Sequence, residues 1–310
     1  MILTVTMNPS IDIAYIMDSF VPDQVNRVKE IHKTAGGKGL NVTRVLRKTG
    51  NKVLATGLTG GKNGEFLKEQ LDHAGVVSDF YEIKGDTRNC IAILHEGKQT
   101  EILEAGPAVS QEEYAGFIDH FQMLVQRCAA AVFSGTPPRG IEDDCYACLT
   151  EIAKKYSVPV ILDCSGAPFQ KALTSEQKPD AIKPNIHELQ DLLGRNISKD
   201  PECLKEALSE KIFDGIAWIV VSLGADGCFA KHHDTFYTVK IPKISVISAV
   251  GSGDATVAGI AAGIVKGMND EELLKHANTL GMLNAQEKET GTVNLDHYDS
   301  LYRQIIVTKV

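Results

Sequence analysis

A glycine-rich stretch, "AVGSGDATVAGIAAG" at residues 249–263, places the ionisable Asp254 at the start of an apolar, small-residue helix pattern. The free N–H groups of Gly251, Ser252 and Gly253 at a helix start would form an anion site, which the helix dipole favours. A carboxylate there repels a bound phosphate unless it has a chemical role. Phosphoryl transfer supplies one, because a base must take a hydroxyl proton while backbone amides hold the transferred group.

Two other interpretations of this stretch remain open. Asp254 could be an ordinary helix-start aspartate, stabilising the helix by about 0.5–1 kcal/mol through the dipole. Gly251 and Gly253 also form the GxG of a dinucleotide-binding loop, but Thr256 stands where the third glycine is expected. The chain has no GxxxxGK[ST] motif, so any ATP site is not a P-loop.

A second candidate site is "TAGGKGLNVTRVLRKTG" at residues 34–50. Gly37 permits close backbone approach to a ligand, Lys38 supplies charge, and Asn41 both donates and accepts hydrogen bonds. Residues 27–52 hold eight Lys or Arg and a single acid. The simplest interpretation of Arg44 and its neighbours 47 and 48 is a solvated helix face.

Three cations lie near turns or strand ends and are candidate clamps for an anionic substrate. Arg27 and Lys38 flank turns, and "DTRNC" places Arg88 at a loop–strand junction. Arginine holds phosphate in a bidentate fashion. The pattern is therefore consistent with an anionic substrate.

Further polar residues follow expected strands. In "NPSIDI", Asp12 either binds sugar hydroxyls or is a turn aspartate. In "IKPNIHELQDLLG", Lys183 and Asn185 end a strand and Glu188 begins a helix; this set could hold a hydrated Mg²⁺ or form a capping box, and the two roles are compatible. "VVSLGADG" offers Ser222, Gly224 and Gly227, which either border nucleotide phosphates or turn the chain.

These residues need a scaffold, and the chain alternates short apolar runs with helical patterns. Strands are expected at 2–7, 52–58, 130–135, 158–164, 180–185 and 217–224, and helices at 64–75, 112–129, 146–156 and 203–213. This alternation predicts an α/β fold: a doubly wound, mostly parallel sheet with helices on both faces. Ligands bind beyond the carboxyl ends of such strands.

Two segments break the alternation. Residues 11–35 have little helical character, and 88–104 form a hairpin pattern turning at 95–99. Together they predict either a small β-sheet lid or an antiparallel extension of the main sheet. We expect one α/β domain over 1–310, with a lid made by about 11–35 and 87–105.

Composition limits the possible functions. The 310 residues are 43% hydrophobic and 23% charged, with a net charge of −8. This argues against nucleic-acid and anionic-membrane partners. No apolar run reaches the roughly 20 residues of a membrane span, and the N-terminus lacks a signal-peptide pattern, so the expected location is cytoplasmic. The seven scattered cysteines are therefore read as reduced thiols, with Cys145 and Cys148 as helix residues rather than a metal or redox pair.

Six segments, in order, resemble the ribokinase-like, PfkB-type carbohydrate kinases: "NPSID", "AGGKGLNV", "TGLTGGKNGEF", "KPNIHE", "SLGADG" and "VGSGDATVAG". The resemblance spans essentially the whole chain. Within the family it points to the phosphosugar branch of tagatose-6-phosphate kinases and 1-phosphofructokinases. "TRNCIAILHEGKQTEILE" and "ANTLGMLNAQEKETG" look most like the tagatose-6-phosphate kinases of lactose and galactose catabolism.

The resemblance implies a ribokinase-like fold with a β lid, often the contact of a homodimer, and the cofactors ATP and Mg²⁺. It implies that Asp254 is the base acting on the C1 hydroxyl of a 6-phosphorylated ketohexose such as D-tagatose 6-phosphate. The alternative substrate is fructose 1-phosphate. The implied sites are the Gly251–Ser252–Gly253 anion hole; Asp12, Gly37 and Asn41 at the sugar; Lys38, Arg88 and Arg27 at its phosphate; Lys183, Asn185, Glu188, Ser222, Gly224, Gly227 and Asn278 at the nucleotide; and Glu188, through water, at Mg²⁺.

The sequence departs from the commoner family pattern before the glycines. Ser248-Ala249 replaces an acidic residue–threonine pair, and Ser252 replaces an alanine. Relatives use part of this region for a monovalent cation, so potassium activation does not follow for this chain. Ser252 retains its backbone N–H, so the anion hole is expected to persist.

The assignment of Asp254 as the base predicts the behaviour of Asp254→Asn. ATP binding should remain nearly intact, while turnover should fall by about 10²–10⁴-fold or more, because the variant cannot accept the hydroxyl proton. Steady-state turnover and ATP-binding titrations measure the two effects. Near-normal turnover would contradict the assignment.

Overall fold

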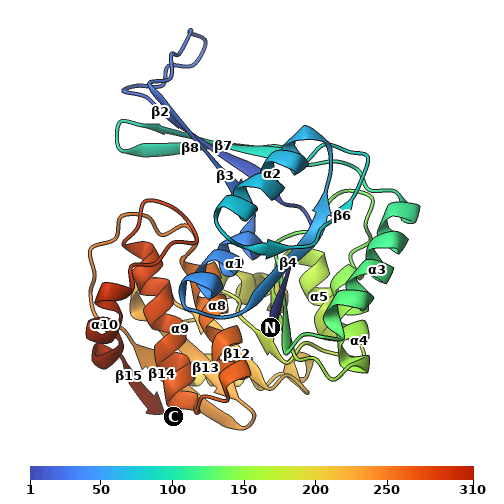
Figure 1. Ribbon diagram of the computed structural model, residues 1–310. Coiled ribbons are helices and arrows are strands. Elements are labelled where there is room, and N and C mark those ends of the chain that lie inside the picture. The colour runs from blue at the N-terminus through green and yellow to red at the C-terminus, as the bar shows by residue number, and fades with distance from the viewer.

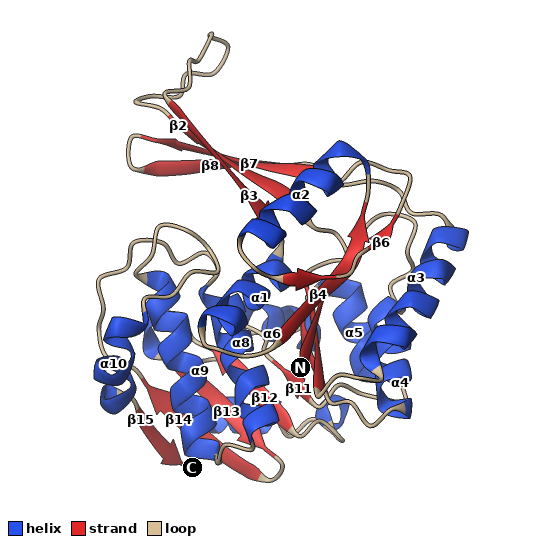
Figure 2. Cartoon of the chain, viewed as in Figure 1, coloured by secondary structure: helices blue, strands red, loops and turns tan.

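A computed structural model describes all 310 residues as two β-sheets with helices packed around the larger one (Figures 1 and 2). The strands of the larger sheet are β1 (Ile2–Thr6), β4 (Val53–Thr59), β5 (Val77–Ser78), β6 (Tyr81–Glu82), β9 (Ala130–Ser134), β10 (Val160–Asp163), β11 (Ala181–Ile182), β12 (Trp218–Ser222), β13 (Cys228–His232), β14 (Thr235–Lys240) and β15 (Ile306–Lys309). Their order is β15-β14-β13-β12-β11-β10-β9-β1-β4-β5, with β6 also on β4.

The larger sheet is parallel from β5 to β12 and antiparallel from β12 to β15. The six expected apolar strands are β1, β4, β9, β10, β11 and β12, and all belong to the parallel part. The predicted α/β class is confirmed. The antiparallel edge β13–β15 was not anticipated.

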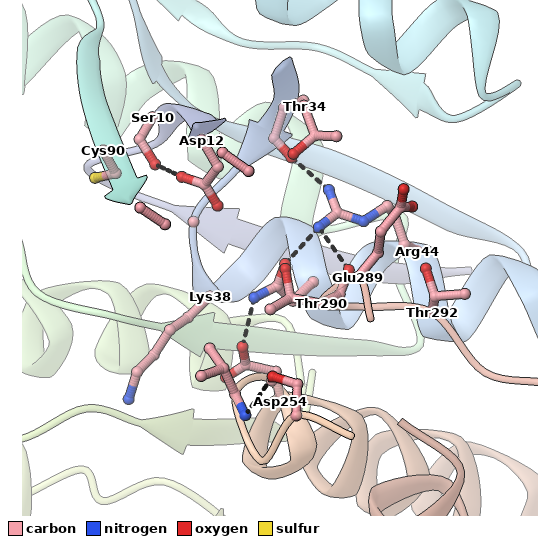
Figure 3. A pocket seen from close by; sticks show the side chains of 18 of the residues that line it. Ser10, Asp12, Thr34, Lys38, Arg44, Cys90, Asp254, Glu289, Thr290 and Thr292 are labelled. Carbon is pink, nitrogen blue, oxygen red and sulfur yellow. Dashed lines mark hydrogen bonds between the residues drawn. The ribbon is translucent and has the colours of Figure 1, made fainter. Parts of the chain in front are cut away.

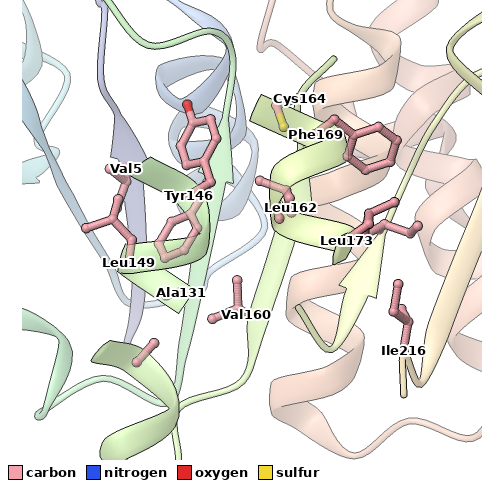
Figure 4. Packing of buried hydrophobic residues seen from close by; sticks show 14 of the residues in the cluster. Val5, Ala131, Tyr146, Leu149, Val160, Leu162, Cys164, Phe169, Leu173 and Ile216 are labelled. Atoms are coloured by element: carbon pink, nitrogen blue, oxygen red, sulfur yellow. The ribbon is translucent and has the colours of Figure 1, made fainter. Parts of the chain in front are cut away.

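Helices cover both faces of this sheet. They are α1 (Lys38–Lys48), α2 (Gly61–His73), α3 (Gln111–Val125), α4 (Cys145–Lys155), α5 (Gly166–Thr174), α6 (Ile186–Leu193), α7 (Pro201–Ala207), α8 (Ser252–Lys266), α9 (Asp270–Ala285) and α10 (Tyr298–Gln304). Successive side chains of a strand point to opposite faces of the sheet, so the buried residues form two hydrophobic cores, one on each face. Leu3 of β1 belongs to a cluster with α3, α4 and α5, part of which is drawn in Figure 4. Its neighbour Ile2 belongs to the cluster with α1, α8 and α9.

A second sheet projects from the core as the lid (Figure 1). It contains β2 (Ser10–Ile16), β3 (Glu30–Gly36), β7 (Arg88–His95) and β8 (Lys98–Leu103), in the order β3-β2-β7-β8. The central pair β2–β7 is parallel and the outer pairs are antiparallel. One face packs on α2 through a cluster that includes Ile11, Ile13 and Leu71. The separate sheet, and not an extension of the main sheet, is therefore the observed arrangement.

The chain reverses its direction of travel across the sheet at β1. From β1 it proceeds to β4 on one side, whereas β9, β10, β11 and β12 follow one another on the other side. Such a switch point opens a crevice at the carboxyl ends of the strands, where α/β proteins bind ligands.

None of the helices combines the length and the apolar character that a membrane-spanning segment requires.

Candidate active site

A pocket of about 700 Å³ lies at these strand ends, between the core and the lid (Figure 3). This volume suits small-molecule ligands, whose pockets commonly measure about 300–1,000 Å³. The structure brings together most of the sequence-predicted site residues here: Asp12, Gly37, Lys38, Asn41, Arg88, Lys183, Asn185, Glu188, Ser222, Gly251, Gly253 and Asp254.

The other predicted residues do not line this pocket. Arg27 is exposed in the segment between β2 and β3. Gly224 and Gly227 lie in the turn between β12 and β13, and a side chain at Gly227 would strike the carbonyl of Val239. Asn278 is buried on α9, where its amide donates to the Leu274 carbonyl at 2.8 Å. These contacts give Gly227 and Asn278 clear structural roles.

Asp254 is the third residue of α8 and is only 6% exposed. Its Oδ2 accepts a hydrogen bond from Asn41 Nδ2 at 2.7 Å. Burial, followed by the nearby negative charge of Asp163, raises the pKa of Asp254 to about 6, although Asn41 and two lysines act in the opposite direction. A carboxylate with this pKa is suited to general-base catalysis near neutral pH.

Asp163, at the end of β10, is a second buried carboxylate of the site and was missed by the sequence analysis. Its Oδ1 lies 3.2 Å from Lys183 Nζ, and its Oδ2 lies 3.6 Å from Lys38 Nζ. Burial acts to raise the pKa of Asp163, but the two lysines outweigh it and hold that pKa below its usual value. Asp163 therefore remains ionised and positions both cations.

The two lysines lie on the core side of the pocket. Asp163 is the main cause of a raised pKa at Lys38, with smaller contributions from Asp254 and Glu188. Figure 3 shows Lys38 pointing away from Asp12. A side chain placed on Gly253 would lie 3.3 Å from Lys183 Nζ. The lysines therefore border the base and the glycines that precede it.

The start of α8 lies where the sequence predicts an anion hole. The first helical hydrogen bond runs from Ala255 N–H to the Gly251 carbonyl at 2.9 Å. The N–H groups of Gly253 and Asp254 precede that bond and have no helical partner. The Ser252 N–H differs from expectation because it already donates to the Ala249 carbonyl at 3.3 Å. Gly253 and Asp254 are thus the better-placed donors.

The lid contributes the opposite wall. Asp12 accepts from the Ser10 hydroxyl at 2.7 Å, and its pKa is raised by burial. Gly37 has a φ of +111°, and a side chain there would lie 2.9 Å from Thr6, which explains the glycine between β3 and α1. Arg88 donates to the Glu104 carbonyl at 3.0 Å, while its buried Nε has no partner.

Arg44 contradicts the expectation of a solvated helix face. Its side chain lines the pocket, where Nη1 donates to the Ala35 carbonyl and Nη2 to Asn41 Oδ1 at 2.5 Å. Burial lowers its pKa from the usual arginine value. By contrast Arg47, one turn later, is exposed, as expected.

The residues expected at a magnesium ion could hold a cation that keeps most of its waters, but they do not form a site built from protein ligands alone. Asn185 and Glu188 form the predicted capping box of α6, with Glu188 Oε2 accepting from the Asn185 N–H at 2.8 Å. No group of three or more metal-ligating side chains exists. Mg²⁺ normally keeps several waters and binds one or two carboxylates together with substrate phosphates. The second oxygen of Glu188 suits that role.

The site combines a buried carboxylate with a raised pKa, free backbone N–H groups at a helix start, and two lysines beside both. These parts suit transfer of a phosphoryl group to a hydroxyl, in which positioning and charge neutralisation supply most of the catalysis. The fold and site thus define a phosphotransferase with an alcohol acceptor.

Comparison with known proteins agrees. Residues 5–297 match the family described as pfkB family carbohydrate kinase, and the chain belongs to that family. A Staphylococcus aureus structure provisionally named a phosphofructokinase is 29% identical, with a TM-score of 0.87 over 100% of this chain and 99% of that one.

Two further solved structures are similar over nearly the full length. Phosphofructokinase-2 from Escherichia coli in complex with potassium is 26% identical, with a TM-score of 0.91, covering 97% of this chain and 98% of that one. A Thermotoga maritima protein provisionally named 1-phosphofructokinase is 25% identical, with a TM-score of 0.86, covering 100% and 99%. Phosphosugar kinases are thus the structural neighbours.

The hydrogen bond from Asn41 to Asp254 predicts a pH effect. Below about pH 6 Asp254 is protonated and cannot act as a base, so kcat/KM should rise through that range and level off above it. Removing the amide that favours the charged carboxylate raises the pKa further, so Asn41→Ala should move the acid limb to higher pH.

The substrate's own phosphate titrates near pH 6 as well, so one profile cannot assign the acid limb. The substrate's pKa is the same for both enzymes, and the difference between wild type and Asn41→Ala therefore isolates Asp254. Superimposable profiles would contradict the assignment of the limb to Asp254.

Proposed function

We propose that this pfkB-family kinase transfers the γ-phosphoryl group of ATP to the C1 hydroxyl of D-tagatose 6-phosphate, giving D-tagatose 1,6-bisphosphate and ADP. The observation that carries the proposal is a cation separate from the two lysines, Arg88, on the lid wall of the pocket, with a buried Nε that lacks a partner. Its charged neighbour is Asp12, and it also lies near the Cys90 thiol, whose pKa is raised by burial. The charged neighbours of Lys38 are Asp163, Asp254 and Glu188.

These two environments supply separate anion sites. The core site, with Lys38 and Lys183, would receive the transferred phosphoryl group beside Asp254. The lid site, with Arg88, would bind a phosphate already on the sugar, because a guanidinium with a free donor pairs well with phosphate oxygens. This differs from the sequence-based expectation, which placed Lys38 at the sugar phosphate. An acceptor with a phosphate at the end remote from its reacting hydroxyl suits both sites.

In the proposed reaction, Asp12 and Asn41 orient the sugar and the C1 hydroxyl faces Asp254. Asp254 takes the hydroxyl proton while the new O–P bond forms at the γ-phosphorus and the bond to the ADP oxygen breaks. The N–H groups of Gly253 and Asp254, with the two lysines, stabilise the charge on the transferred group. Glu188 would help to hold a hydrated Mg²⁺, which would supply further neutralisation of the phosphates.

Tagatose 6-phosphate is preferred as the substrate because of two segments. Residues 87–104 and 277–291, which most resemble tagatose-6-phosphate kinases, both line the pocket, the first through Arg88, Cys90 and Glu101 and the second through Lys288, Glu289 and Thr290.

The second candidate is 1-phosphofructokinase activity, which converts fructose 1-phosphate to fructose 1,6-bisphosphate. The observation in its favour is the similarity to the Thermotoga maritima protein that provisionally carries that name. The same two anion sites would serve it with the sugar bound end for end.

Coupled ADP release with ATP and Mg²⁺ tests the proposal against tagatose 6-phosphate, fructose 6-phosphate and fructose 1-phosphate. We expect kcat/KM for the 6-phosphates to exceed that for fructose 1-phosphate by about tenfold or more, because only they place C1 at Asp254 and phosphate at Arg88. The 6-phosphates differ from one another only at C4, so a smaller difference is expected between them.

Asp254→Asn, purified in the same way, controls for contaminating kinases. Arg88→Met should raise KM for the sugar phosphate and leave KM for ATP unchanged. A preference for fructose 1-phosphate would replace the proposed substrate, and no turnover with any of the three would contradict both candidates.

We further propose that the kinase is a homodimer joined through its lids. Large apolar side chains are exposed on both edge strands of the lid: Ile31 of β3 is 56% exposed, and Ile102 and Leu103 of β8 are 53% and 60% exposed. Exposed edge strands with apolar side chains favour pairing with another chain.

Light scattering at micromolar concentration should give twice the 33.6 kDa mass of the chain. Replacing Ile102 by lysine should shift the protein toward a monomer, because a charge would then be buried at the contact. The matched control replaces Val77 by lysine, since Val77 is also exposed but lies outside the lid. A monomeric wild-type protein would refute the proposal.

A further inference from the structure

Arg44 forms a hydrogen-bonded chain that ends at the catalytic carboxylate. Its Nη2 donates to Asn41 Oδ1 at 2.5 Å, and Asn41 Nδ2 donates to Asp254 Oδ2 at 2.7 Å. Figure 3 shows Arg44 on the far side of this chain from Asp254. Arg44 thus reaches the base through one intervening amide.

The order of donors and acceptors makes this chain directional. An Asn side chain has one acceptor oxygen and one donor nitrogen. Because a guanidinium only donates, it selects the orientation in which Asn41 Oδ1 faces Arg44. The NH₂ group then faces Asp254, whose carboxylate only accepts. The reverse orientation would set donor against donor at Arg44 and oxygen against oxygen at Asp254, so Arg44 fixes the direction of the Asn41 amide.

Arg44 also contacts other parts of the chain. Nη1 donates to the carbonyl of Ala35, the penultimate residue of the lid strand β3, and Nη2 also donates to the carbonyl of Thr290 at 3.2 Å. A side chain on Gly291 would lie 2.9 Å from Arg44 Nε and 2.9 Å from Asn41 Cα. The segment after α9 therefore closes over the Arg44–Asn41 pair.

The charges around this chain come from several elements. Asp12 of β2, Asp254 of α8 and Glu289 of the segment after α9 all attract Arg44. Asp254 also faces Lys38 of α1, Asp163 of β10 and Lys183 after β11. Both lysines form ion pairs with Asp163. The side chain that donates a hydrogen bond to Asp254 is that of Asn41.

From these contacts we infer that Arg44 is a positioning residue for phosphoryl transfer. It holds the Asn41 amide in the orientation that directs the Asp254 carboxylate toward the acceptor hydroxyl. It also links that amide to Ala35 of the lid strand β3 and to Thr290 of the segment after α9. This role rests on the proposed phosphosugar kinase function. It requires no contact between Arg44 and the substrate.

A double-mutant cycle with Arg44→Met, Asn41→Ala and the double variant tests this role. Arg44→Met should lower kcat by about 10- to 100-fold with KM for ATP unchanged, because a displaced base slows the chemical step. In the Asn41→Ala background the same substitution should have little further effect, since its route to Asp254 is gone. Arg47→Met, one turn along the exposed face of α1, is the matched control and should retain wild-type kcat.

A second measurement needs no substrate. The ¹³C NMR titration of the Asp254 carboxyl group in the ligand-free protein should show a raised pKa in Arg44→Met, as in Asn41→Ala. In the Asn41→Ala background the further shift from Arg44→Met should be smaller, because only the direct charge attraction between Arg44 and Asp254 then remains. Equal shifts with and without Asn41 would overturn the inference. If wild type turned over none of the sugars, the proposed substrate would fail, and the titration would still decide the role of Arg44.

Thermal melting shows whether Arg44→Met folds. If it does not fold, Arg44→Lys is the variant to use in its place. Lysine keeps the charge but cannot serve three acceptors on different segments, so partial loss of kcat and a smaller pKa shift of the same sign are expected. Wild-type kcat and an unchanged Asp254 titration in Arg44→Lys and Arg44→Met would overturn the inference.

Discussion

The active site depends on an unequal sharing of positive charge between two buried carboxylates. Asp163 lies against Lys38 and Lys183, whereas Asp254 receives a hydrogen bond from a neutral amide. Desolvation acts on both groups, but only Asp163 has the partners that overcome it. One carboxylate is therefore permanently charged and structural, and the other can accept a proton near neutral pH. Two identical functional groups acquire different chemistry from their surroundings.

The lid and the phosphoryl-transfer site share a short connection. Strand β3 ends at Gly36, Gly37 follows with its positive φ, and α1 begins with Lys38. A displacement of the lid strand is thus transmitted within one residue to the lysine that borders the base. The lid wall and the lysines of the pocket are therefore joined by a short stretch of chain, and a ligand that bridges both walls would stabilise one arrangement of the two.

Local sequence signals were sufficient for much of the fold and part of the site. Apolar strand patterns, the capping box at Asn185 and the glycine-flanked Asp254 are properties of a few consecutive residues, and each was found in the predicted place. Asp163 and Arg44 could not be assigned in this way. The partners of Asp163 lie on other segments of the chain, and only the fold brings them to it. Arg44 lies in a helix pattern typical of a surface residue, and only the fold brings the Ala35 and Thr290 carbonyls to its guanidinium. The antiparallel edge β13–β15 likewise depends on pairing with the C-terminal strand.

The insertion of the lid at two distant points in the chain also affects how the protein folds. The hairpin β2–β3 lies between β1 and α1, and the hairpin β7–β8 lies between β6 and α3, yet their central strands pair in register from Ser10 with Arg88 to Ile16 with Leu94. Closing so long a loop costs entropy before the pairing returns any stabilisation, and contacts of this kind form slowly. The parallel core strands β1 and β4 bring the two insertion points together. The lid would therefore assemble on a largely formed core, and Asp12 and Arg88 would reach the pocket only after Asp163 and its two lysines are in place.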